Sequence, residues 1–148
     1  MTTYAVRRRV ACYVTRSTGA GAELLVFDHR DDDPDDPSGT QIPAGGMLPF
    51  EALVEAAVRE IREETGLDDL AYVDQVGFVE LGLDEPGGPS MTTYVHLAAP
   101  DGGPESWEHT VVGDGSDAGM VFSCRWEKLP LTVDLAGGQG QFLAALAE

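Results

Sequence analysis

Short runs of hydrophobic residues, many alternating with polar ones, occupy most of the chain and predict a protein built mainly from strands. Runs at 4–15 and 22–29 flank the turn-forming stretch 17–21 and predict a hairpin or two adjacent strands. Further strands are expected at 71–83, 91–99 and 121–129. The segment 100–119 is expected to be a long glycine-rich loop with room for one short strand.

One segment, 51–65, has the period of a long amphipathic helix, and Gly66 follows it as a helix stop. The apolar residues that share one side of this helix, and are therefore expected to face the core, are Leu53, Val54, Ala57 and Ile61. A second, short amphipathic helix is expected at 140–148. Strands on both sides of a central helix predict an α+β fold of the α/β/α sandwich kind, with a mixed sheet between helices.

The composition fits one folded domain spanning 1–148, because the length of 148 residues suffices for a hydrophobic core. The net charge of −17 disfavours a nucleic-acid polymer as partner, since it would repel a polyphosphate backbone. No apolar run approaches the ~20 residues of a membrane span, and no signal-peptide pattern opens the chain, so we expect a cytoplasmic protein that does not bind membranes. Cys12 and Cys124 are expected to be buried free thiols.

Three acidic residues of the helical segment, Glu60, Glu63 and Glu64, fall at i, i+3 and i+4 and therefore span one arc of the helix. They adjoin the apolar side instead of lying opposite it. Like charges at these spacings repel unless a cation lies between them. Carboxylate oxygens favour a hard ion, so the spacing predicts a site for Mg²⁺ or Mn²⁺.

Two further features surround these glutamates. Arg59 lies one turn from both Glu55 and Glu63 and is expected to pair with them and orient the carboxylates. Glu51 is expected to serve the helix N-terminus or to hold the loop before it. In that loop, Gly45 and Gly46 would let the backbone approach the carboxylates closely, so that a glycine carbonyl could join the metal ligands.

The full spacing is Gly45-x5-Glu51-x7-Arg59-Glu60-Ile61-x-Glu63-Glu64-x-Gly66-Leu67, and it resembles the signature of the Nudix hydrolases at every fixed position. The resemblance implies hydrolysis of a nucleoside diphosphate linked to another group, by water activated on divalent ions. It implies metal binding by Glu60, Glu63, Glu64 and the carbonyl of Gly45, and catalytic roles for Glu63, Glu64 and Arg59. Phe50 departs from the pattern, because many members carry glycine there.

The general base and the substrate contacts stay open at this stage. The base could be a glutamate of the motif or one of the later acids Glu105, Glu108, Asp114 and Asp117. The candidates for contacting a base or sugar are Tyr94, Trp107, His109 and Phe122, and core packing is the alternative role for each aromatic residue. Arg7, Arg8 and Arg9 could offer charge to a terminal phosphate, although at most two of them share a face of a strand.

Two rival functions are weighed against the enzyme. A nucleotide-sensing Nudix-like module without catalysis would be expected to lack part of the glutamate set, and no glutamate is missing here. Isomerisation of a diphosphate substrate would need a dedicated cysteine and glutamate pair. The expected partner is a small-molecule nucleoside diphosphate derivative of unspecified identity, and the chain could be a monomer or a homodimer.

Overall fold

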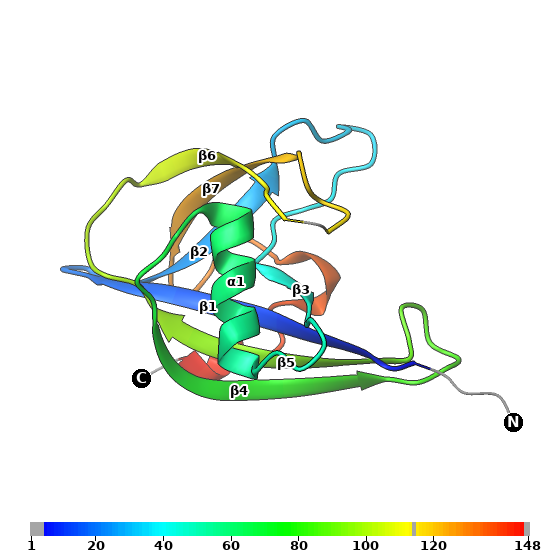
Figure 1. Cartoon of the computed structure of the whole chain (residues 1–148). Coiled ribbons are helices and arrows are strands. Elements are labelled where there is room, and N and C mark those ends of the chain that lie inside the picture. Colours follow the sequence, from blue (N-terminus) through cyan, green and yellow to red (C-terminus); the bar gives the residue numbers. More distant parts are fainter. Residues whose placement is uncertain (1–4, 114, 147–148) are drawn as a thin grey trace, which may run out of the picture.

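The computed structural model describes residues 5–113 and 115–146, and it contains one mixed sheet with a single α-helix on one face (Figure 1). The strands follow the order β4-β5-β1-β2-β7-β6, and β3 pairs with β1 beside this path. Only the β1–β5 pair is parallel. The strands are β1 (Arg7–Thr18), β2 (Gly21–His29), β3 (Ala44–Gly46), β4 (Ala71–Leu81), β5 (Ser90–Ala98), β6 (Ser106–Thr110) and β7 (Val121–Lys128).

Both faces of the central strands are covered. Along β1, Val10 and Cys12 belong to the core cluster under the helix, whereas Ala11 and Tyr13 belong to a second cluster on the opposite face. This division follows from the alternation of side chains along a strand. The hairpin of β1 and β2 is confirmed, with Thr18 opposite Gly21 at its turn. The short strand expected within 100–119 is β6.

The helix α1 (Leu53–Thr65) begins two residues later than the sequence pattern indicates. The Glu55 side chain accepts the Ala52 backbone N–H at 2.9 Å and so stabilises the first turn. Gly66 ends the helix in the left-handed region at φ 78°, where glycine has no steric penalty. The expectation for Val54 was wrong, because this first-turn residue is 40% exposed and the core contacts are centred on Ala56, Ala57 and Ile61.

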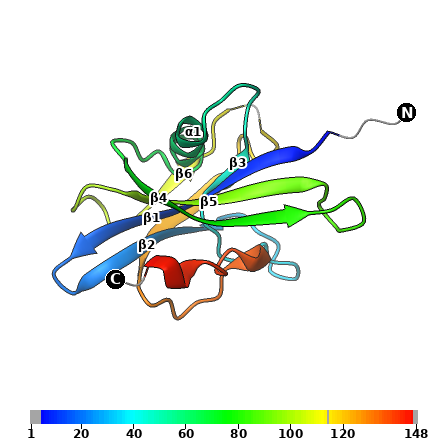
Figure 2. The same ribbon diagram turned by 90° about the horizontal axis from the view of Figure 1, so that it is seen from below.

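The opposite face carries two 3₁₀ turns, η1 (Ala136–Gly138) and η2 (Leu143–Leu146), in place of the expected amphipathic helix (Figure 2). Gly137 interrupts the first of them with a φ of 62°. An apolar segment this short cannot by itself repay the cost of nucleating an α-helix. The second layer of the sandwich is therefore a thin, irregular cover that packs Leu135, Phe142 and Leu143 against the sheet.

Two further expectations bear on the function. Cys12 and Cys124 are buried free cysteines, as predicted. Within the described residues, no helix combines the length and the apolar character that crossing a membrane would require.

Candidate active site

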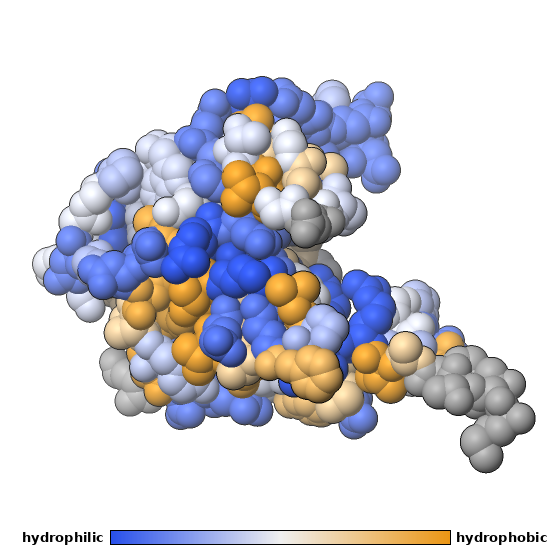
Figure 3. Space-filling view, in the orientation of Figure 1, coloured by the Kyte–Doolittle hydropathy of each residue, from blue (hydrophilic) through white to orange (hydrophobic). Residues whose placement is uncertain are grey.

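A pocket of about 440 Å³ lies between α1, β3, the start of β1 and the loop that joins β6 to β7. Figure 3 shows hydrophilic surface crossing the side of the molecule that carries α1, with smaller hydrophobic patches beside it. The pocket brings all three glutamates of the motif together with Gly45 and Arg59. Its charged lining residues are Arg7, Arg9, Arg59, Glu60, Glu63, Glu64 and Asp117.

Two of the three glutamates are removed from water. Glu60 and Glu64 are 8% and 5% exposed, whereas Glu63 is half-buried. Burial raises the pKa of Glu64 to about 9, although the Ala44 N–H donates to its Oε1 at 2.9 Å, and the negative charges of Glu60 and Asp117 raise it further. Burial also raises the pKa of Glu60. The site therefore disfavours its own ionised form in the absence of a cation.

Arg59 connects the glutamates to the loop before the helix. Its guanidinium donates to Glu51 at 2.7 Å, to Glu60 at 3.0 Å and to Glu63 at 3.3 Å. It also donates to the Gly46 carbonyl at 2.9 Å. The predicted pairing with Glu63 is thus present, whereas the predicted pairing with Glu55 is absent because that side chain caps α1.

Glu51 holds the loop, as one of its two predicted roles stated. Its Oε1 accepts the Leu48 backbone N–H at 2.9 Å while its other oxygen pairs with Arg59. The neighbouring guanidinium lowers the pKa of Glu51. The loop, the arginine and the carboxylates are therefore one connected unit, so a change in any of them is expected to move the others.

Two glycines, one from each side of the pocket, lie directly against the carboxylates. A Cβ on Gly45 would stand 2.3 Å from the Glu60 carboxylate, and a Cβ on Gly113 would stand 2.8 Å from the Glu63 carboxylate. Gly113 also has a φ of 106°, which L residues rarely adopt. Sequence reasoning identified Gly45 but missed Gly113, whose only signal is a glycine within a glycine-rich loop.

The donor set suits a hard divalent ion, because several carboxylates meet beside a backbone that no side chain screens. Among residues 5–113 and 115–146, no group of three His, Cys, Asp or Glu side chains is arranged to hold an ion as it stands. Arg59 and the Ala44 N–H occupy carboxylate oxygens that an ion would need. Ion binding would therefore require these side chains to exchange hydrogen-bond partners.

The later acids separate clearly. Asp117 lines the pocket, whereas Glu105 pairs with Arg16 at 2.7 Å and Glu108 pairs with Arg30 at 3.3 Å, and neither lines it. Asp114 lies outside the described residues. Of the described candidates among the later acids, Asp117 alone lines the pocket.

The three aromatic candidates do not line the pocket. Tyr94 and Phe122 are 4% and 1% exposed and belong to the two core clusters, which leaves neither ring free to stack on a base. Tyr94 lies under the segment after β7 and Phe122 under α1, so strand-end position was a poor guide to exposure. Trp107 packs against the core under α1, and its ring nitrogen donates to the Thr65 carbonyl at 2.8 Å.

β6 and the loop after it position the C-terminal end of α1 by forming hydrogen bonds to carbonyl groups of its last turn. The Glu63 carbonyl accepts from the Val112 N–H at 3.1 Å and lies 3.0 Å from the His109 ring nitrogen. The hydrogen bond from Trp107 reaches the same helix end. These contacts fix the helical turn that carries Glu63 and Glu64, a positioning role that the sequence did not reveal.

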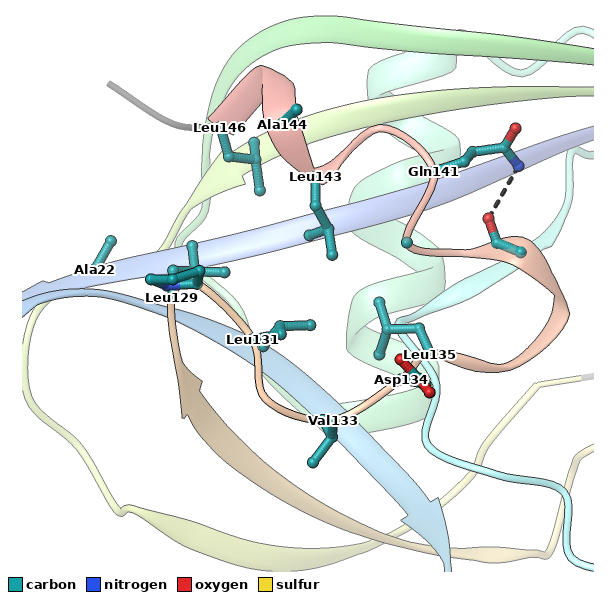
Figure 4. Close-up of a pocket in the computed structure, with 13 residues that line it drawn as sticks. Ala22, Leu129, Leu131, Val133, Asp134, Leu135, Gln141, Leu143, Ala144 and Leu146 are labelled. Atoms are coloured by element: carbon teal, nitrogen blue, oxygen red, sulfur yellow. Dashed lines mark hydrogen bonds between the residues drawn. The ribbon is translucent and has the colours of Figure 1, made fainter.

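A second pocket, of about 1100 Å³, lies on the opposite face beneath the 3₁₀ turns (Figure 4). Leu129, Leu131 and Leu143 project into it, and Asp134 contributes its one acidic side chain. Tyr13 of β1 anchors the chain between the two 3₁₀ turns to the sheet. Its hydroxyl donates to the Gln139 carbonyl and accepts from the Phe142 N–H. No residue of this pocket belongs to the glutamate motif.

Many solved structures share this fold, including the three that follow. C. elegans Ap4A hydrolase is 16% identical, covers 97% of this chain and 100% of its own, and has a TM-score of 0.62. The NUDIX domain of Shewanella oneidensis NrtR, complexed with ADP ribose, is 16% identical over 98% of this chain and 88% of its own, with a TM-score of 0.64. UDP-X diphosphatase is 9% identical over 99% of this chain and 64% of its own, with a TM-score of 0.65.

A search of curated proteins finds no match to the chain. The family model of the NUDIX domain, in contrast, matches residues 5–146, which is almost the whole chain. This match extends the resemblance well beyond the motif at 45–67, and the fold agrees with it. The chain therefore belongs to the Nudix hydrolase family.

Proposed function

We propose that the chain hydrolyses the diphosphate linkage of a nucleoside diphosphate derivative with a divalent ion, Mg²⁺ or Mn²⁺, bound by Glu60, Glu63 and Glu64. Membership of the family makes the chain a Nudix-type pyrophosphatase acting on nucleoside diphosphate derivatives. The ion, the substrate within this class and the roles of individual residues are the proposal.

The observation that carries the proposal is the burial of two adjacent carboxylates at the wall of the pocket. The pKa of Glu64 is raised to about 9, mainly because burial removes water from its ionised form. An arrangement of this kind is unfavourable for stability alone, since buried like charges repel and lack solvent. A divalent ion would offset the desolvation and the repulsion together, which supports metal binding as the reason for the arrangement.

Each residue then has a chemical task. A bound divalent ion acidifies a water molecule and neutralises the diphosphate. Glu60, Glu63, Glu64 and the Gly45 carbonyl would hold the ion, and the hydrogen bonds of Arg59 keep Glu60 and Glu63 in place. Asp117 or Glu63 accepts the proton of the attacking water, whose oxygen bonds to one phosphorus as the other phosphate leaves.

The rival functions gain no support from the described residues. Cys12 and Cys124 are fully or almost fully buried, and burial raises the pKa of Cys124 to about 12, so no described thiolate faces the pocket for isomerisation chemistry. The experiment below also distinguishes a nucleotide-sensing module from an enzyme, because a sensing module would bind a nucleotide without cleaving it.

The test is an incubation of the purified chain with a nucleotide panel, with and without Mg²⁺ or Mn²⁺, with released phosphate measured by colour. The panel contains nucleoside triphosphates, nucleoside diphosphates, ADP-ribose, nucleotide sugars and dinucleoside polyphosphates. Inorganic pyrophosphatase is added for the nucleoside triphosphates, whose cleavage can release pyrophosphate. A phosphatase is added only for ADP-ribose, nucleotide sugars and dinucleoside polyphosphates, whose uncleaved forms carry no terminal phosphate. We expect metal-dependent cleavage of at least one compound, lost in both Glu63→Gln and Glu64→Gln.

Either of two results would overturn this assignment. Cleavage that persists in both variants would remove the glutamates from the reaction. If nothing is cleaved while one nucleotide raises the melting temperature, the chain is a nucleotide-binding module instead of an enzyme.

A further inference from the structure

Two arginines stand in the catalytic pocket without a role in hydrolysis itself. Arg7 and Arg9 of β1 line the same 440 Å³ pocket as the three glutamates. Residues two apart on a strand project to the same side, so Arg8 between them projects to the other. Consistent with this, Arg8 does not line the pocket.

These arginines differ from most other cations of the chain in lacking an acidic partner. In residues 5–113 and 115–146, five arginines form ion pairs with carboxylates, namely Arg16, Arg30, Arg59, Arg62 and Arg125. Arg7 and Arg9 form no such pair with a described carboxylate, although the chain carries a net charge of −17. Their positive charge is therefore available to an anion from outside.

Arg9 provides a second, independent observation. Its Nε is a buried side-chain nitrogen without a hydrogen-bond partner, and it is the one such atom found in the described part of the chain. A buried N–H without an acceptor is unfavourable, and folded proteins rarely keep one without a reason. An anion bound at this end of the pocket would supply the missing acceptor.

The register of the sheet places Arg9 beside the catalytic unit and yet apart from it. Arg9 is opposite Gly46 across the β1–β3 pair, and the Gly46 carbonyl accepts from Arg59 at 2.9 Å. Adjacent strands lie ~4.8 Å apart, so Arg9 begins about one strand spacing from the Gly46 residue whose carbonyl holds Arg59. Arg59 is itself occupied by three carboxylates and this carbonyl.

We propose that Arg7 and Arg9 bind a phosphate that lies outside the diphosphate being hydrolysed, so that the preferred substrates carry three or more phosphates in a row. This inference rests on the proposed function and narrows it. Guanidinium groups bind phosphate oxygens through paired hydrogen bonds, and a strongly acidic protein needs such local charge to hold a polyanion. A diphosphate capped by a sugar at each end, as in ADP-ribose, offers no third phosphate to this subsite.

The first test compares kcat/KM for ATP and ADP-ribose, with saturating Mg²⁺, in the unmodified chain and in two variants. Arg7→Gln combined with Arg9→Gln is expected to lower kcat/KM for ATP by about 100-fold, since each charged hydrogen bond lost is worth roughly tenfold or more. The same double variant should change ADP-ribose cleavage by less than about threefold. Arg8→Gln, on the same strand, is the matched control and should leave both values within about twofold.

A binding measurement separates failure of this inference from failure of the proposed function. Calorimetric titration with inorganic tripolyphosphate and with pyrophosphate, both with Mg²⁺, reports the subsite even in a chain that cleaves no nucleotide. We expect the Arg7→Gln and Arg9→Gln double variant to lose about tenfold or more in tripolyphosphate affinity and little in pyrophosphate affinity.

Three results would overturn the subsite. The first is an unmodified chain that binds tripolyphosphate no better than pyrophosphate. The second is an equal loss in Arg8→Gln, which would reduce the effect to net charge. The third is an equal loss for ATP and ADP-ribose in the double variant, which would place the arginines on the diphosphate itself. Melting temperatures of all variants check that each one folds.

Discussion

The two faces of the sheet carry pockets of opposite character. The smaller pocket, over α1, gathers four acidic and three arginine side chains around backbone that glycines leave open. The larger one, under the 3₁₀ turns, is lined mostly by leucine and small residues, with Asp134 as its one acid. Size and apolar character are the usual marks of a ligand site, yet here the smaller and more charged pocket has the perturbed carboxylates.

The difference shows what each face contributes to the molecule. Around the smaller pocket, the buried carboxylates and the buried Nε of Arg9 are unfavourable for stability and useful for chemistry. On the opposite face, Phe142 lies so close to Gly77 that a Cβ there would stand 2.3 Å from its ring. That close packing seals the second core cluster. One face is thus organised for function and the other for stability, and each can be tested separately.

The largest effect is expected from exchanging acids for amides in the two pockets. Glu64→Gln should lower kcat by at least about 100-fold, because it removes a group that acts in the transition state. Asp134→Asn, the same kind of change in the apolar pocket, should leave kcat within about twofold. Steady-state kinetics on the best substrate of the panel compares them. An equal loss of kcat in both variants would contradict the claim that only the pocket over α1 takes part in catalysis.

The next largest effect concerns stability and pH in the metal-free chain. The pKa of Glu64 is raised from 4.5 to about 9, mainly by burial. Its contribution to stability is therefore fully present below pH 4.5 and is lost as the pH rises through about 9, since the unfolded state releases the proton first. Glu64→Gln should accordingly be more stable than the unmodified chain at pH 8, by on the order of a few kcal/mol, and similar to it at pH 4.5.

Chemical denaturation with EDTA present, at a series of pH values, measures this difference. Asp134→Asn is the control and should follow the unmodified chain throughout. In a parallel series with Mg²⁺ in place of EDTA, the stability difference between Glu64→Gln and the unmodified chain at pH 8 should become smaller, because the ion replaces the proton at the carboxylate. A gap that does not change with pH would show that Glu64 is not desolvated in the folded state.

A smaller effect is expected on the opposite face. Tyr13→Phe removes the hydroxyl that joins β1 to Gln139 and Phe142, and should destabilise the fold by about 1–2 kcal/mol. The catalytic parameters should stay unchanged, because no pocket residue over α1 contacts this hydroxyl. Tyr72→Phe, a change at a 40% exposed tyrosine, provides the baseline in urea unfolding. A fall in kcat with Tyr13→Phe would show that the faces are coupled.

The smallest effect concerns the loop before α1. Phe50 is fully exposed and has a φ of 64°, a left-handed conformation that strains a residue with a side chain. Phe50→Gly should therefore stabilise the chain by up to about 1 kcal/mol, after allowing for the greater entropy of glycine in the unfolded state. Asp69→Gly, at a φ of 59°, should gain less, since aspartate tolerates this region better. Thermal unfolding ranks the two, and destabilisation by Phe50→Gly would mean that the ring has a contact elsewhere.

The sequence predicted α1, its glutamates and the approach of Gly45, because these depend on spacing within a few turns of chain. A helix of 3.6 residues per turn brings Glu60, Glu63 and Glu64 together whatever the rest of the fold does. Pairing of β1 with β3, in contrast, joins Arg9 to a partner many residues away. No local pattern shows that this pairing places Arg7 and Arg9 at the catalytic pocket, or that Gly113 meets Glu63.

The misjudged positions have a common cause as well. Tyr94 and Phe122 have the strand alternation of half-exposed residues, and their burial comes from the second layer that the C-terminal segment and α1 supply. The apolar pattern at 140–148 indicated a helix, while glycine and the short length gave 3₁₀ turns in the described part. In both places the periodicity of the sequence was not enough to predict the structure, because tertiary packing and local glycines determined it.

The most direct test of the account is a titration with Mn²⁺ followed by electron paramagnetic resonance, which counts bound ions without requiring a substrate. The unmodified chain should bind Mn²⁺, the Glu63→Gln and Glu64→Gln double variant should lose this binding, and Asp134→Asn should retain it. Unchanged Mn²⁺ binding in the double variant would contradict the claim that the buried glutamates of α1 form the catalytic metal site.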